Sequence, residues 1–152
     1  AVMGIYLNPG NEKFYRSINS EIYVDKTGLI GYTNKILNTM QQNVWVSRPR
    51  RFGKTMAADM LTAYYSLGCD SKKLFQGLEI AEDPDFEKHL NKYNTIFINV
   101  QEFLSRTNGT NKLTDRIQKI VLQDIQNEYP EIDYFDKDDL SESMQDVYEE
   151  TS

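Results

Sequence analysis

The sequence has very few residues of the kinds that hold metals or form covalent cross-links. Its 152 residues include one cysteine, Cys69, and one histidine, His89. A disulfide within the chain needs two cysteines, and a structural zinc site needs about four ligands, mostly cysteine or histidine. His89 sits in the charged run FEKHLNKY, so we expect a surface histidine rather than a catalytic one. These absences exclude an intrachain disulfide framework and argue against a zinc centre and a histidine-dependent triad.

Long hydrophobic runs are also missing. No stretch of 18 consecutive apolar residues is present, which is about the length that a membrane-spanning helix needs. The first ten residues, AVMGIYLNPG, have no basic region followed by an apolar stretch, so they do not resemble a secretory signal. We therefore expect no membrane contact. The single cysteine fits a reducing, cytoplasmic compartment.

Basic residues are outnumbered by acidic ones, but the two signs are unevenly distributed. The chain carries 17 Lys and Arg against 23 Asp and Glu, a net charge of −6. Residues 128–152 hold ten acids and one base, whereas the first 127 residues, with 16 bases and 13 acids, have a net charge of +3. No acid occurs between Thr27 and Ala58. This pattern argues against a protein that is basic throughout, and it leaves room for one local phosphate site.

Hydrophobic periodicity predicts an alternation of helices and short apolar strands. The clearest helix is 55–67, and the longest is 111–129, whose apolar stripe consists of Leu113, Ile117, Ile120, Val121 and Ile125. Other helices are expected over 12–18, 27–38, 71–75, 83–90 and 138–148, and short β-prone runs over 22–24, 44–46 and 95–100.

Strands that alternate with helices are typical of an α/β protein with a parallel sheet. Two runs, 44–46 and 95–100, have the composition of buried strands, whereas a doubly wound sheet has about five to six strands. We therefore expect residues 3–152 to form the N-terminal portion, and an incomplete one, of a three-layer α/β domain. Residues 128–152 would form an acidic C-terminal segment, helical in part and truncated.

The most informative stretch joins the expected strand 44–46 to the expected helix 55–67. The loop between them is Arg48-Pro49-Arg50-Arg51-Phe52-Gly53-Lys54-Thr55. Strand, loop, Gly-Lys-Thr and helix is the layout of a phosphate-binding loop, because the first turn of a helix offers unpaired N–H groups and partial positive charge to a phosphate. Gly53 allows close approach of the backbone, Lys54 supplies a compact cation, and Thr55 offers a hydroxyl to Mg²⁺.

The loop departs from the full Gly-x4-Gly-Lys-Ser/Thr pattern. Arg48 stands where the first glycine is expected, and Pro49 removes one backbone donor. On the pattern alone, phosphate binding and an empty loop are both open. The arginines Arg48, Arg50 and Arg51 leave a similar choice between a solvated loop with local ion pairs, a contact with phosphate or nucleic acid, and a finger directed at a neighbouring subunit.

Two segments together resemble the predicted AAA-ATPase-like family of bacterial proteins. One is Tyr23-Val24-Asp25-Lys26-Thr27, and the other runs from Ser47 through Arg48-Pro49-Arg50-Arg51-Phe52-Gly53-Lys54-Thr55 to Met60-Leu61. Proteins of that family carry a YVDKT-type stretch and an RPRRFGK[ST] loop, which is a modified Walker A motif without the first glycine. The resemblance covers roughly residues 3–105 and implies a P-loop NTPase domain of the AAA type.

The resemblance also implies a ligand, ATP, and a metal, Mg²⁺. The nucleotide-binding residues that it implies are Arg50, Arg51, Phe52, Gly53, Lys54 and Thr55. Thr55 would also hold Mg²⁺ through the nucleotide. An ATPase further needs an acid after a second apolar strand, and neither Asp25 nor Asp133 has that setting. In the family that strand comes later, so we expect the Walker B acid beyond residue 152, little or no hydrolysis by the present chain, and a PD-(D/E)XK nuclease-like domain in a longer one.

A second hypothesis needs no hydrolysis. A nucleotide-dependent or nucleic-acid-contacting interaction module would use the same basic loop, and its binding to nucleic acid would weaken with salt. Asp25 and Lys26 are likewise open between a place near the nucleotide base and a turn that leads into a helix. Base preference and oligomeric state are not determined by the sequence.

Overall fold

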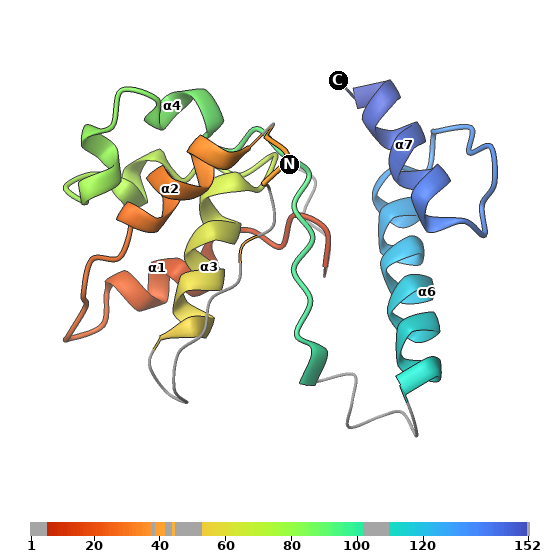
Figure 1. Cartoon of the computed structure of the whole chain (residues 1–152), viewed down its shortest axis with the longest axis horizontal. Helices are drawn as coiled ribbons and strands as arrows, with labels where there is room; N and C mark the ends of the chain where they lie inside the picture. The colour runs from red at the N-terminus through yellow and green to blue at the C-terminus, as the bar shows by residue number, and fades with distance from the viewer. Residues whose placement is uncertain (1–5, 38, 42–43, 45–52, 102–109, 152) are drawn as a thin grey trace. The chain divides into compact units, whose positions relative to one another are not determined.

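Two separate hydrophobic cores organise the chain. The structure is a computed structural model that describes residues 6–37, 39–41, 44, 53–101 and 110–151. One unit is formed by Gly10–Thr95, and the other by Val2–Pro9 together with Ile96–Ser152. Figure 1 shows the course of the chain through both units. Because each unit has its own core, each is described by itself.

Short helices make up most of the first unit. They are α1 (Glu12–Ile18), α2 (Gly28–Ile36), α3 (Lys54–Tyr65) and α4 (Phe86–His89), with the 3₁₀ helices η1 (Lys72–Phe75) and η2 (Glu79–Glu82) between α3 and α4 (Figure 1). The helices expected over 12–18, 27–38 and 55–67 are confirmed to within two residues at each end. The one expected over 83–90 is shorter, because the Asp83 side chain accepts the N–H of Asp85 in a turn (2.8 Å) that comes before α4.

Helix α3 supplies the centre of the first core. Tyr64 is fully buried, packs edge-on against Phe75 with 5.7 Å between ring centroids, and donates its hydroxyl proton to the carbonyl of Phe86 (2.7 Å). The neighbouring Tyr65 is hydrogen-bonded to Thr33 of α2, and burial raises the pKa of Tyr65 to about 12 although that bond acts in the opposite direction. The buried core residues are Phe14, Ile30, Met60, Ala63, Tyr64, Phe75, Ile80 and Phe86.

The C-terminal end of α3 is held by a residue from the loop after α4. Asn91 adopts a left-handed backbone (φ 54°) and donates its amide to the carbonyls of Ala63 and Ser66, both at 2.9 Å. Its N–H donates to the carbonyl of Tyr64 (2.7 Å), and its side-chain oxygen accepts the N–H of Ser71 (3.0 Å). A helix end leaves its last carbonyls without intrahelical partners, and Asn91 satisfies those of Ala63 and Tyr64 here. Helix α3 is therefore fixed at the end opposite Lys54 and Thr55.

The second unit is organised by a pair of helices, α6 (Thr110–Glu128) and α7 (Leu140–Thr151). The expected apolar stripe of α6 is confirmed at Leu113, Val121 and Ile125, which are buried. The expected helix in the acidic tail is also confirmed, and it begins two residues later than expected. Asp139 determines that start, because its carboxylate accepts the N–H of Glu142 (2.9 Å) as a helix cap does.

The run 95–100 does not form the continuous strand that its composition predicts. Ile96 makes a single antiparallel bridge with Leu7, and Phe97 donates its N–H to the carbonyl of Tyr6 (2.9 Å). The Asp124 carboxylate accepts the N–H groups of both Tyr6 and Leu7, at 2.9 and 2.7 Å, and so takes the place of a further strand. Within the described ranges the β-structure consists of isolated bridges, and most of 44–46 lies outside those ranges. The parallel sheet therefore stays a prediction.

His89 is not the surface residue that its charged neighbours suggest. Its exposed fraction is 8%, and its Nδ1 lies 2.7 Å from the hydroxyl oxygen of Tyr93. The two rings stack with their centroids 5.9 Å apart. The expectation is wrong because positions three apart on a helix share a face, which puts His89 on the same side of α4 as the buried Phe86.

Candidate functional site

The site begins with Gly53, which directly precedes α3. Gly53 adopts a left-handed backbone (φ 83°, ψ 18°), and its carbonyl accepts the first hydrogen bond of the helix from Ala57 (2.9 Å). A Cβ at this position would lie 2.6 Å from Nζ of Lys26. The backbone conformation favours glycine, whereas the flexible end of the Lys26 side chain could move away from a Cβ. The chain can therefore turn into α3 with its first amide groups uncovered by a side chain at position 53.

Lys54 and Thr55 open the first turn of α3, and both are exposed. That turn contains no acidic residue, so nothing in it offsets the partial positive charge of the helix N-terminus. An ammonium, a hydroxyl and helix N–H groups in this order suit a phosphate chain and its Mg²⁺. The other expected binding residues, Arg50, Arg51 and Phe52, lie outside the described residues. Their contact with nucleotide or nucleic acid stays a prediction.

A tight turn formed by Asp25, Lys26 and Thr27 adjoins the loop. The Asp25 carboxylate accepts the N–H and the hydroxyl of Thr27, at 2.8 and 2.6 Å, and also the N–H of Glu79 (2.8 Å). The fully buried Thr27 hydroxyl in turn accepts the N–H of Ile80 (3.2 Å). Partial burial raises the pKa of Asp25, but these hydrogen bonds outweigh it and hold that pKa below its usual value. Of the two readings of Asp25, the helix-entry turn is confirmed.

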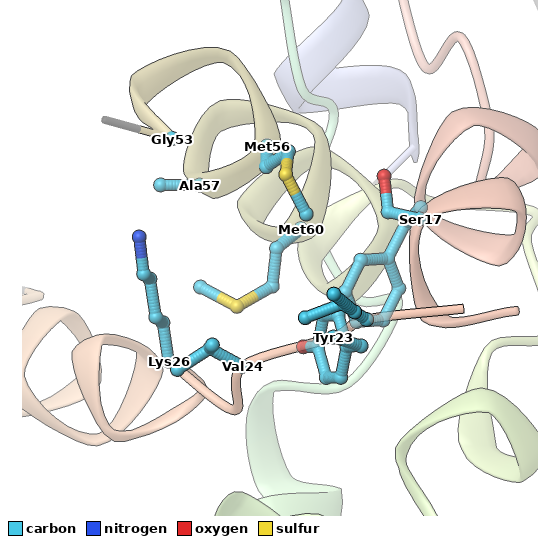
Figure 2. A pocket seen from close by; sticks show the side chains of 10 residues that line it. Ser17, Tyr23, Val24, Lys26, Gly53, Met56, Ala57 and Met60 are labelled. Atoms are coloured by element: carbon cyan, nitrogen blue, oxygen red, sulfur yellow. The ribbon is translucent and has the colours of Figure 1, made fainter. Parts of the chain in front are cut away.

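A cavity of about 270 Å³ opens beside Gly53. Figure 2 shows Lys26 extending toward the first turn of α3, where Gly53 and Ala57 lie, with Met56 and Met60 of the same helix nearby. The other lining residues are Phe14, Ser17, Ile22, Tyr23 and Val24. Most of these side chains are apolar or aromatic, and Lys26 supplies the cation. A flat apolar group that carries a negative charge at one end would match this lining.

Carboxylates of the surrounding elements are poorly suited to bind a metal directly. Both carboxylate oxygens of Asp25 are engaged in the turn. Asp59 of α3 is partly buried, which raises its pKa although the charge of Lys13 acts in the opposite direction. No group of three or more His, Cys, Asp or Glu side chains suited to a metal ion occurs in the part of the chain that the structure describes.

The comparisons with known proteins show the family of the chain. A family model described as predicted AAA-ATPase matches residues 10–152, and the chain belongs to this AAA-ATPase-like family. No curated protein and no solved structure matches the chain. Among the described residues, no helix is both long enough and apolar enough to cross a membrane.

The structure brings two motifs together that are more than twenty residues apart in sequence. The Tyr23–Thr27 stretch and the Gly53 turn meet at the cavity through Lys26. The sequence leaves Lys26 open between a place near the nucleotide base and a turn that leads into a helix, and the structure adds Met56 and Met60 to the cavity lining. Ile22 and Val24 are apolar residues of the cavity lining, and their side chains are unusually exposed, at 83% and 63%. This exposure indicates the cavity, but it can be recognised only in the structure.

Proposed function

We propose that this chain binds MgATP, with the triphosphate on the first turn of α3 and the base in the neighbouring cavity. The observation that carries the proposal is the left-handed Gly53 immediately before Lys54 and Thr55, in a chain of the AAA-ATPase-like family. Lys54 binds the β- and γ-phosphates as a point charge, and the amides of the first turn bind a phosphate through hydrogen bonds. These contacts follow from residue type and position at the helix start.

The size of the cavity supports a binding mode in which only the base of the nucleotide lies in the cavity and the triphosphate lies on the first turn of α3. At about 270 Å³ it is slightly smaller than the about 300–1,000 Å³ typical of pockets for whole small molecules. A nucleobase fits such a space, while the phosphates lie outside it along α3. The Tyr23 ring at the cavity offers a surface for stacking, and Met56 and Met60 offer adaptable apolar contacts.

Magnesium fits this site as an ion that is bound together with the nucleotide, mainly through the phosphates. Mg²⁺ prefers oxygen ligands and usually binds through one or two protein groups plus phosphates. Thr55 supplies an exposed hydroxyl in the first turn of α3, which suits that role. Bound Mg²⁺ would neutralise charge on the β- and γ-phosphates.

Hydrolysis is the second half of the proposal. An ATPase positions an attacking water with a carboxylate or amide, and Asp25 and Asp59 are engaged or buried as described above. We place the hydrolytic acid on a strand that follows residue 152 in a longer chain. The 152-residue chain is then expected to bind MgATP and to turn it over slowly.

Calorimetric titration of MgATP tests the binding half directly. We expect saturable binding by the wild type and an affinity about tenfold to a hundredfold lower for Lys54→Ala, since charged hydrogen bonds contribute about 1.5–3 kcal/mol. Lys88→Ala is the matched control, because Lys88 is an exposed lysine on α4 outside the cavity lining, and it should leave the affinity unchanged. Equal affinities for wild type and Lys54→Ala would overturn the proposal.

A further inference from the structure

Lys26 stands against the glycine of the phosphate loop. Its Nζ lies 2.6 Å from the point that a Cβ of residue 53 would occupy, so the ammonium uses the space that the glycine leaves empty. Figure 2 shows the side chain extending toward Gly53 and Ala57 at the start of α3. The cation therefore lies between the apolar cavity and the helix start.

The backbone on both sides of Lys26 is fixed. Asp25 and Thr27 are joined by two hydrogen bonds and are tied to the start of η2 through the N–H groups of Glu79 and Ile80. The carbonyl of Lys26 accepts the N–H of Leu29 (3.1 Å) as α2 begins. A long side chain on such a rigid turn can present its charge at a defined place with little loss of backbone entropy.

The electrostatic setting favours an anion at this point. The N-terminus of α3 carries partial positive charge, and both Lys26 and Lys54 add a full charge near it. An anion at this point would interact favourably with both lysine charges and with the helix N-terminus.

We propose that Lys26 is a second phosphate-binding cation, which contacts the phosphate chain where it leaves the cavity and passes onto α3. This inference rests on the proposed nucleotide site and deepens it, because it assigns a binding role to a residue outside the phosphate loop. An ammonium has three donors and needs no fixed fork geometry, so it can follow a phosphate chain at the cavity mouth. If Lys26 binds phosphate, its replacement should weaken the binding of ligands that carry phosphates and leave the binding of adenosine unchanged. A residue that only packs against the cavity would not produce this difference.

Titrations of Lys26→Met with MgATP and with adenosine test this dependence. Met keeps most of the side-chain length and removes the charge. We expect MgATP affinity to fall about tenfold, whereas adenosine affinity, followed by NMR chemical shifts, stays that of the wild type. Lys26→Arg keeps the charge and should bind MgATP within about threefold of the wild type. Lys88→Met, the same change on exposed α4, should have no effect.

The outcomes separate this inference from the proposed function. Wild-type MgATP affinity in Lys26→Met overturns the role of Lys26 and leaves the nucleotide site standing. An equal loss of MgATP and adenosine affinity also overturns it, because the residue would then shape the cavity rather than bind phosphate. If the wild type itself does not bind MgATP, the proposed function fails first. A melting curve without ligand checks that Lys26→Met is folded.

Discussion

Two neighbouring residues, Asp25 and Lys26, have opposite roles. The carboxylate of Asp25 accepts three hydrogen bonds and holds the turn, while the ammonium of Lys26 reaches the Gly53 position. The acid thus holds the turn, and the base lines the cavity. A motif of five residues can in this way combine a rigid support with a charge that it presents to a ligand.

The pH dependence of stability should reveal the role of Asp25. Its pKa in the folded chain lies below the ordinary value of 3.8, so the ionised group stabilises the fold above that value. This stabilisation is lost as the pH falls through the lowered pKa. We expect Asp25→Asn to reduce the free energy of unfolding by about 1 kcal/mol at pH 7, and the difference from wild type to shrink toward pH 2.

Urea denaturation at a series of pH values measures this difference. The same substitution at Asp70, an exposed acid in the loop after α3, serves as the control and should have little effect at any pH. A difference between wild type and Asp25→Asn that stayed constant from pH 7 to pH 2 would contradict the role assigned to the carboxylate.

Helix α3 carries the proposed site, and its two ends differ in their contacts. The C-terminal end is held by Asn91, and the N-terminal end presents Lys54 and Thr55 to solvent. A helix anchored at one end can keep the other end in place for a ligand, since the buried Tyr64 and Ala63 prevent it from shifting. The geometry of the first turn therefore depends on contacts at the far end.

Replacing Asn91 tests this dependence. Asn91→Ala removes three side-chain hydrogen bonds. It also places alanine, which has no polar side chain to stabilise it there, in the left-handed region of the backbone. We therefore expect the free energy of unfolding to fall by about 2–4 kcal/mol. Asn91→Gly, which relieves the backbone strain alone, should recover part of the loss. Thermal unfolding measures both, and Lys92→Ala at the exposed next position is the control. Wild-type stability in Asn91→Ala would refute the anchoring role.

Helices could be predicted from this sequence more readily than strands or the cavity. Helical periodicity is local, so the stripe of α6 and the limits of α3 follow from the residues themselves. A strand needs a partner, and nothing in the run 95–100 shows that its partners would be Tyr6 and Leu7. The N–H groups of those two residues go to the carboxylate of Asp124. The loop motif located Gly53, Lys54 and Thr55, whereas the cavity depends on a chain turn that brings Ile22 toward α3.

At the scale of the whole molecule, several acidic side chains of the second unit have a structural role. Four acids of the second unit accept backbone N–H groups: Asp124, Asp136, Asp139 and Asp146. These carboxylates join the N-terminal residues Tyr6 and Leu7 to α6 and help to form the start of α7 and the turn before it. All described residues of the proposed site belong to the other unit, Gly10–Thr95. The net charge of the chain consequently says little about its ligand.

The amide signal of Gly53 in a ¹⁵N-labelled chain tests the central claim most directly. Glycine amides are few, since the chain has eight glycines, and the Gly53 amide lies at the proposed phosphate position. We predict that saturating MgATP shifts the signals of Gly53, Lys54 and Thr55, while Gly77, which has open space around it, stays unchanged. Unchanged signals at all three loop positions in saturating MgATP would contradict the account.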